Sequence, residues 1–76
     1  MTKTKISNAD LTAIFYERIA RSPDCPLGIQ LAIIPVEPSG WTARMNTGQR
    51  SRHPLCAKRF DMVLKQLRAT YDLARD

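Results

Sequence analysis

Two strands and the turn between them are encoded by residues 29–46, IQLAIIPVEPSGWTARMN. Residues 29–36 are apolar and rich in β-branched side chains, which favours a strand, and Pro35 favours an edge position because it lacks a ladder donor. Residues 37–40 carry proline at the second position and glycine at the fourth, as type I turns do. Residues 41–46 alternate apolar and polar side chains, which is typical of a half-buried strand. Together they predict an antiparallel hairpin with one face on a core.

A helix is expected on each side of this hairpin. Ser7 and Asp10 form a helix start that resembles a capping box, and Ser22 with Pro23 marks the end of that helix. Pro54 suits the first position of a second helix, where no N–H donor is needed. The apolar stripe of the first helix is Leu11, Ile14, Phe15 and Ile19, and that of the second is Cys56, Phe60, Val63, Leu64, Leu67, Tyr71 and Ala74.

The predicted fold is a single small α+β domain spanning residues 1–76, in α-β-β-α order, with the antiparallel hairpin packed against two helices. Residues 47–53 are expected to form a polar loop, and residues 1–5 to be flexible. A composition of 43% hydrophobic and 25% charged residues is typical of a chain that folds.

Apolar runs and cysteine usage set expectations for the cellular environment. No apolar run approaches the roughly 20 residues of a membrane-spanning helix, so no membrane partner is expected. The first residues, MTKTK, do not resemble a secretory signal, so a cytoplasmic location is expected. In that compartment Cys25 and Cys56 are expected to be reduced thiols.

The positive charge of the chain is concentrated in one segment. The sequence has 12 basic and 7 acidic residues, which gives a net charge of +5. Basic and acidic residues balance within residues 1–37 and again within residues 61–76. Residues 38–60 contain no acidic residue and therefore carry the whole excess. Such an asymmetry points to an anionic partner.

The polar side chains of this segment form the candidate binding site. The expected loop leads into a helix start, where free N–H groups and the helix dipole favour phosphate or carboxylate. Gly48 and Gln49 would give the loop flexibility and donors. The candidate anion-binding or nucleic-acid-binding residues are Arg44, Arg50, Ser51, Arg52, Lys58 and Arg59. We expect a non-catalytic domain that binds a polyanion, with nucleic acid as the first candidate. The other interpretation of the basic segment is a solvated loop that keeps the protein soluble.

Part of this segment resembles the double-stranded RNA-binding domain. The similar residues are 48–52, Gly-Gln-Arg-Ser-Arg, followed by Ala57 and Lys58. In that family, too, a basic loop enters the last helix and the first helix precedes the sheet. The family has a third strand that is not expected here, and Pro54 interrupts the basic run, so neither its function nor its site residues are transferred. The resemblance implies only that such a loop and helix can hold phosphates.

A different function class is suggested by the hairpin. Ala32, Ile34 and Val36 should point away from the helices, which would leave an apolar strip in solvent. This strip would suit a protein-interaction or regulatory adaptor, including a homodimer that joins two hairpins into a larger sheet. A monomer whose termini cover part of the strip is the remaining alternative.

Catalysis, metal binding and cofactor binding are not expected. His53 near Cys56 at a helix start could in principle activate a thiol, but Cys56 also begins an apolar stripe, which favours a buried, inert side chain. A zinc site would have to combine both cysteines with His53 and Asp24, without any paired spacing to support it. Of the aromatic residues, Trp41 and Tyr71 are predicted to be core, and Tyr16 is the candidate for an exposed ring.

Overall fold

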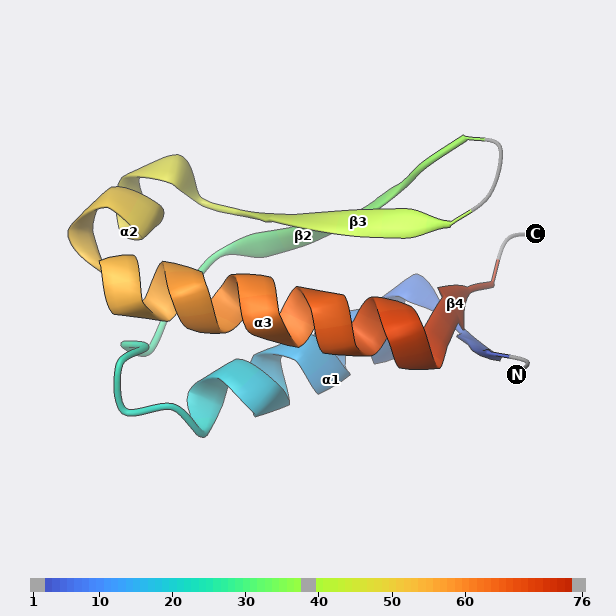
Figure 1. Cartoon of the computed structure of the whole chain (residues 1–76), viewed down its shortest axis with the longest axis horizontal. Helices are drawn as coiled ribbons and strands as arrows, with labels where there is room; N and C mark the ends of the chain where they lie inside the picture. The colour runs from blue at the N-terminus through green and yellow to red at the C-terminus, as the bar shows by residue number, and fades with distance from the viewer. Residues whose placement is uncertain (1–2, 38–39, 75–76) are drawn as a thin grey trace.

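The computed structural model describes residues 3–37 and 40–74. Its elements are β1 (Thr4–Ile6), α1 (Asn8–Ala20), β2 (Leu31–Pro35), β3 (Trp41–Met45), α2 (Thr47–Arg52), α3 (Pro54–Thr70) and β4 (Tyr71–Leu73). The β2–β3 hairpin lies over a layer formed by α1 and α3 (Figure 1). The predicted α+β class and the hairpin packed against two helices are therefore confirmed. The structure also contains β1, α2 and β4, which were not predicted.

Helix α1 begins as its sequence predicts. The Ser7 hydroxyl accepts a hydrogen bond from the Asp10 N–H at 3.1 Å and so satisfies one of the free donors of the first turn. The buried face carries Leu11, Phe15 and Ile19, which repeat at helical spacing. The helix ends at Ala20, just before the predicted stop.

The hairpin pairs β2 and β3 antiparallel, with Ile33 opposite Ala43. On this register Ile33 and Ala43 face the core, whereas Ala32 is exposed on the other side, as the alternation predicts. Gly40 has a φ of 106°, a left-handed value that favours glycine. The type I turn predicted for this connection depends on Pro38 and Ser39, which lie outside the described residues.

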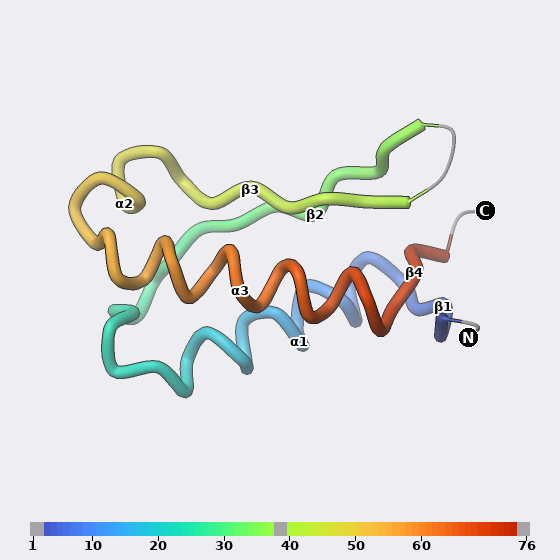
Figure 2. Tube along the Cα trace, viewed as in Figure 1, coloured from blue at the N-terminus to red at the C-terminus, as the bar shows by residue number. Residues whose placement is uncertain are grey.

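A second pair of strands was not predicted. β1 and β4 pair in parallel, with Lys5 opposite Asp72, and the Ala74 N–H continues the pairing by donating to the Ile6 carbonyl at 2.8 Å. Thr4 and Lys5, which belong to the segment expected to be flexible, lie in β1, while residues 1 and 2 lie outside the described residues. β1 and β4 lie side by side at one end of the molecule (Figure 2).

The second predicted helix is shorter at its C-terminal end than its apolar stripe suggested. α3 ends at Thr70, and Tyr71 adopts an extended conformation with φ −121° and ψ 149°. Tyr71 and Leu73 still contact the core, but as alternate residues of a strand and not as part of a helical stripe. A stretch as short as Tyr71–Leu73 fits both the helical and the strand periodicity, which is why the pattern alone gave the wrong element.

The expected polar loop at residues 47–53 is mostly helix α2. Asn46 caps this helix, since its side-chain oxygen accepts the Gln49 N–H at 3.0 Å. None of its residues is buried, so no apolar periodicity marked it in the sequence. His53 then separates α2 from α3, where Pro54 takes the predicted first position.

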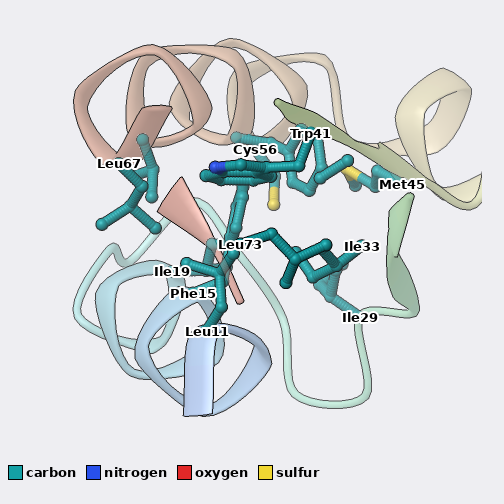
Figure 3. Packing of buried hydrophobic residues seen from close by; sticks show 13 residues of the cluster. Leu11, Phe15, Ile19, Ile29, Ile33, Trp41, Met45, Cys56, Leu67 and Leu73 are labelled. Atoms are coloured by element: carbon teal, nitrogen blue, oxygen red, sulfur yellow. The ribbon is translucent and has the colours of Figure 1, made fainter. Parts of the chain in front are cut away.

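The core joins both helices to the hairpin. Side chains from α1, β3 and α3 point into one interior in Figure 3, with Phe15, Trp41 and Leu67 among the labelled residues. The Phe15 and Phe60 rings lie 4.7 Å apart between centroids. Trp41 is 2% exposed, and its indole N–H donates to the Tyr71 carbonyl at 3.2 Å. The core assignment of Trp41 is confirmed, and Tyr71 is half-buried against the same cluster.

Cys25 and Cys56 form a disulfide, which corrects the prediction of two reduced thiols. The connector between α1 and β2 packs against the first turn of α3 and brings the two Cα atoms to 4.8 Å, within the range that a disulfide spans. Cys56 is completely buried and Cys25 is half-buried. Their pairing depends on this tertiary contact, which no cysteine spacing in the sequence indicates.

Within the described ranges, none of the helices combines the length and apolar character required to cross a membrane.

Candidate functional site

The six predicted site residues lie on three elements: β3, α2 and α3. Arg44 lies on the outer side of β3, where it lines a shallow hollow with residues at the α2 end of the hairpin. Arg50, Ser51 and Arg52 belong to α2, and the Arg52 guanidinium folds back toward Gly48. Lys58 and Arg59 lie on the first turns of α3 and line a different hollow, described below. The sequence grouped these charges by segment, and in the fold Arg44 lines a different hollow from Lys58 and Arg59.

Arg50 is engaged by a carboxylate that lies just outside the basic segment. Its two terminal nitrogens donate to the two Asp61 oxygens at 3.0 and 3.1 Å. The hydrogen bond that Arg50 donates to Asp61 raises the pKa of the Arg50 guanidinium above its ordinary value, although partial desolvation works against that rise. The charge of Arg50 is therefore largely offset in place, which makes it a weak candidate for binding an anion.

The expected phosphate-wrapping loop is absent from this part of the described chain, because residues 47–52 are helical. The Gln49 amide instead has a structural role: it donates to the Gly28 carbonyl at 2.9 Å and accepts the Gln30 N–H at 2.8 Å. These two bonds fix the end of the connector that leads into β2. The resemblance to the double-stranded RNA-binding domain rested on this loop, so the structure does not support it.

The cationic side chains that do come together line a groove between α1 and α3. One wall is the C-terminal end of α1 and the connector, and the other is the outer side of α3. The groove has a volume of about 450 Å³ and is lined by Arg21, Ser22, Pro23, Asp24, Leu55, Lys58, Arg59 and Met62. We call these residues the α1–α3 groove.

Positive charge dominates the α1–α3 groove. Lys58 and Arg59 are exposed and make no ion pair within the described part of the chain. Arg21 bonds to Glu17 at 2.8 Å, but the side chains of this pair are 69% and 66% exposed, so solvent screens it and a stronger anion can compete. Asp24 is the opposing carboxylate of the lining. Among the described residues, three cations and one carboxylate thus line the groove.

Arg21 is the site residue that sequence reasoning missed. Counted by segment, its charge was cancelled by Glu17 and Asp24, so it did not stand out. The fold brings it across from Lys58 and Arg59, which lie far along the sequence. A correct pairing of Cys25 with Cys56 would have indicated this arrangement, because it places the connector beside the start of α3.

The lining of the groove also determines what it can bind. Leu55 and Met62 are 58% and 52% exposed, and the Met62 sulfur lies 3.9 Å from a terminal nitrogen of Arg59. None of the described residues that line the groove is aromatic. Tyr16 is 39% exposed, as predicted, but its hydroxyl accepts the Leu31 N–H at 3.3 Å and it lies outside this groove. Such a lining suits phosphate or carboxylate groups and offers no platform for stacking a base.

The residues considered for catalysis and metal binding in the sequence do not have the arrangement that either role would need. Cys56 is bonded to Cys25 and is buried, so in this state it offers no thiol beside His53. Among residues 3–37 and 40–74, no three histidine, cysteine, aspartate or glutamate side chains gather closely enough to hold a metal ion.

Comparison with protein-family models, curated proteins and solved structures finds no match to this chain.

Proposed function

We propose that this chain is a non-catalytic binding domain whose α1–α3 groove engages a polyanion, specifically the phosphate backbone of nucleic acid. The observation that carries this proposal is the convergence of Arg21, Lys58 and Arg59 on one open groove where Asp24 is the opposing charge. Arginine and lysine on a shared surface attract phosphate at long range and hold it by charge-assisted hydrogen bonds.

The expected binding mode follows from the side chains in the groove. Lysine and arginine contacts to phosphate release counterions, so affinity should fall steeply with salt. Since the described lining of the groove contains no aromatic ring, binding should show little base preference. Arg44 and Arg52 are exposed and would add to the positive field of the domain, whereas Arg50 is already engaged by Asp61.

The test is a titration of fluorescently labelled single- and double-stranded DNA and RNA, followed by fluorescence anisotropy at low and moderate salt. Changing Lys58→Ala and Arg59→Ala together should weaken binding by more than about tenfold at about 0.1 M salt and reduce the salt slope by about 2. Circular dichroism should show an unchanged fold, because both side chains are exposed.

The matched control is the double change Lys65→Ala and Arg68→Ala. This change removes as much charge from α3 as the groove variant does, but Lys65 and Arg68 line a separate hollow with Lys3 and Asp61. This control should reduce affinity by no more than about twofold, since only the general field changes. Equal losses in the two variants would show that net charge, and not the groove, attracts the polyanion.

A second candidate function is a protein-interaction adaptor that uses the outer face of the hairpin. Ala32 and Val36 are exposed and Ile34 is half-buried, so the expected apolar strip exists. An exposed strip of this kind on a small sheet suits a second copy or another protein. Sedimentation of the chain and of an Ile34→Lys variant tests this candidate. A dimer in the wild type that is lost in the variant supports it, and a monomeric wild type at all concentrations excludes the homodimer.

A further inference from the structure

A second, smaller hollow lies between the C-terminal half of α1 and the connector. Its volume is about 140 Å³, and it is lined by Tyr16, Ile19 and Ala20 of α1 together with residues 25–29 of the connector. We call this site the connector hollow. None of the described residues that line it is charged, and its side chains are mostly apolar, in contrast to the cationic α1–α3 groove.

The connector hollow and the α1–α3 groove meet at two points of the chain. Ala20 lines the hollow, and the next residue, Arg21, lines the groove. In the same way Asp24 lines the groove, and the next residue, Cys25, lines the hollow. Because Cα atoms of neighbouring residues are about 3.8 Å apart, the two sites share a boundary. A chain-like ligand whose charged groups lie in the groove therefore has an apolar site within reach.

The walls of the connector hollow are held in place by contacts of different kinds. Ile19 and Ile29 are buried in the core, and Cys25 is fixed by its disulfide. The Tyr16 hydroxyl accepts the Leu31 N–H at 3.3 Å, which fixes the position of the Tyr16 ring. The hollow is thus formed before any ligand arrives, and a preformed site binds without the cost of ordering its side chains.

Two large side chains of the connector hollow are left in water. Leu27 is 97% exposed and lies in a turn with Gly28, whose φ of 84° is a left-handed value that favours glycine. The Tyr16 ring is also partly exposed. A flat apolar group that entered the hollow would remove part of both side chains from water, which is favourable.

Charge, apolar lining and size together specify the occupant. A nucleic-acid strand carries phosphates along its backbone and flat rings beside them, so one strand can place phosphates in the groove and a ring in the hollow. An apolar cavity of about 150 Å³ holds a benzene ring, so a hollow of about 140 Å³ has room for one six-membered ring. The bases of a duplex are stacked and paired, whereas a single strand can turn a base outward.

We propose that the connector hollow binds one base of a single-stranded nucleic acid whose phosphates lie in the α1–α3 groove, an inference that rests on the proposed function. The Tyr16 ring and the Leu27 side chain contact the base. Stacking on an aromatic ring tolerates any base, so the hollow selects single strands over duplexes without reading a sequence.

The first experiment measures fluorescence anisotropy of a labelled oligothymidine, whose bases are single six-membered rings, and of the same strand annealed to oligoadenosine. Tyr16→Leu should weaken binding of the single strand about tenfold, and Tyr16→Phe should stay within about twofold of the wild type. Both variants lose the hydroxyl and its contact with Leu31, so the difference between them reports the ring alone. The salt slope should not change in either variant, because no phosphate contact is lost.

A second variant tests the rim of the hollow with little risk to the fold. Leu27→Ala should weaken binding of oligothymidine about threefold to fivefold, because fewer apolar groups contact the base. The matched control is Val36→Ala, which shortens an exposed apolar side chain beyond the end of β2 and should leave the affinity unchanged. Circular dichroism should show the wild-type fold for both variants, since both side chains are exposed.

The outcomes separate this inference from the proposed function. Weaker binding of oligothymidine by Tyr16→Leu and Leu27→Ala, with duplex binding and salt slope unchanged, supports the base site. Wild-type affinity of Leu27→Ala, or equal losses for the single strand and the duplex, overturns the base site and leaves the groove function intact. A loss in Tyr16→Phe as large as that in Tyr16→Leu also overturns it, because the hydroxyl contact would then be responsible. Absence of binding to either probe by the wild type overturns the groove function, and the base site falls with it. If Tyr16→Leu does not fold, the result for Leu27→Ala decides.

Discussion

The two ends of α3 are attached to the rest of the molecule by different means. At its first turn, Cys56 is joined to the connector by one covalent bond. At its last turn, the chain passes directly into β4, which pairs with β1 through a short parallel ladder. The first end carries Lys58 and Arg59 of the groove, and at the other end Lys5 lies opposite Asp72 in the ladder. The end of α3 that carries the groove residues is therefore attached through a disulfide, which a reductant can open. The end with paired charges is attached through backbone hydrogen bonds between strands.

The largest expected effect is at Phe60, which lies between these two ends and is 1% exposed. Phe60→Ala removes a ring that packs against Phe15, and it should lower the free energy of unfolding by about 3–5 kcal/mol. Urea denaturation followed by circular dichroism measures this loss. Met62→Ala is the matched control on the same helix, because that side chain is 52% exposed and its removal should cost less than about 0.5 kcal/mol. An unchanged midpoint for Phe60→Ala would contradict its place in the core.

Opening the disulfide should have the next largest effect and addresses one end of α3 alone. The bond closes a loop across a sequence separation of 31, which restricts the unfolded chain. Reduction should therefore lower the free energy of unfolding by about 2–4 kcal/mol. Urea titrations with and without dithiothreitol measure this difference. The Cys25→Ser and Cys56→Ala variant should show no response to the reductant, and a wild-type midpoint that dithiothreitol leaves unchanged would show that the bond adds no stability.

The smallest expected effect concerns the Arg50–Asp61 pair, which joins α2 to α3 near the first end. Its side chains are 39% and 57% exposed, so Arg50→Ala should change the free energy of unfolding by less than about 1 kcal/mol. The raised pKa of Arg50 means that its contribution is fully present below the ordinary pKa of arginine and is lost only at higher pH. Over the neutral range Arg50 should therefore add no pH dependence. Any difference between variant and wild type should disappear at about 1 M salt, and a difference that persists there would indicate packing in place of charge.

Sequence patterns predicted the parts of the fold that repeat with a clear period or carry a cap. The Ser7 cap, the alternation in residues 41–46 and the Pro54 helix start all correspond to observed features. The strands β1 and β4 were missed because three residues are too few to establish a period of two. α2 was missed because its residues bury nothing and so leave no periodic signal.

The candidate site was only partly predictable, because it depends on what lies beside the basic segment in space. Lys58 and Arg59 were identified from the local excess of charge, and both line the groove. Arg50 was identified on the same ground, but Asp61, which lies just outside the basic segment, engages it. Arg21 and the disulfide were invisible for the same reason: each depends on a contact between the connector and α3.

The parallel pairing of β1 with β4 has a practical consequence for how the molecule can be handled. Thr4 lies opposite Tyr71, at the end of α3 remote from the α1–α3 groove (Figure 1). A domain whose first and last strands are neighbours can be inserted into a surface loop of a host protein with short linkers. Such a graft would present the groove outward on the far side of the insert. The same adjacency makes a circular permutant feasible, with a new opening at the hairpin turn and the old ends bridged.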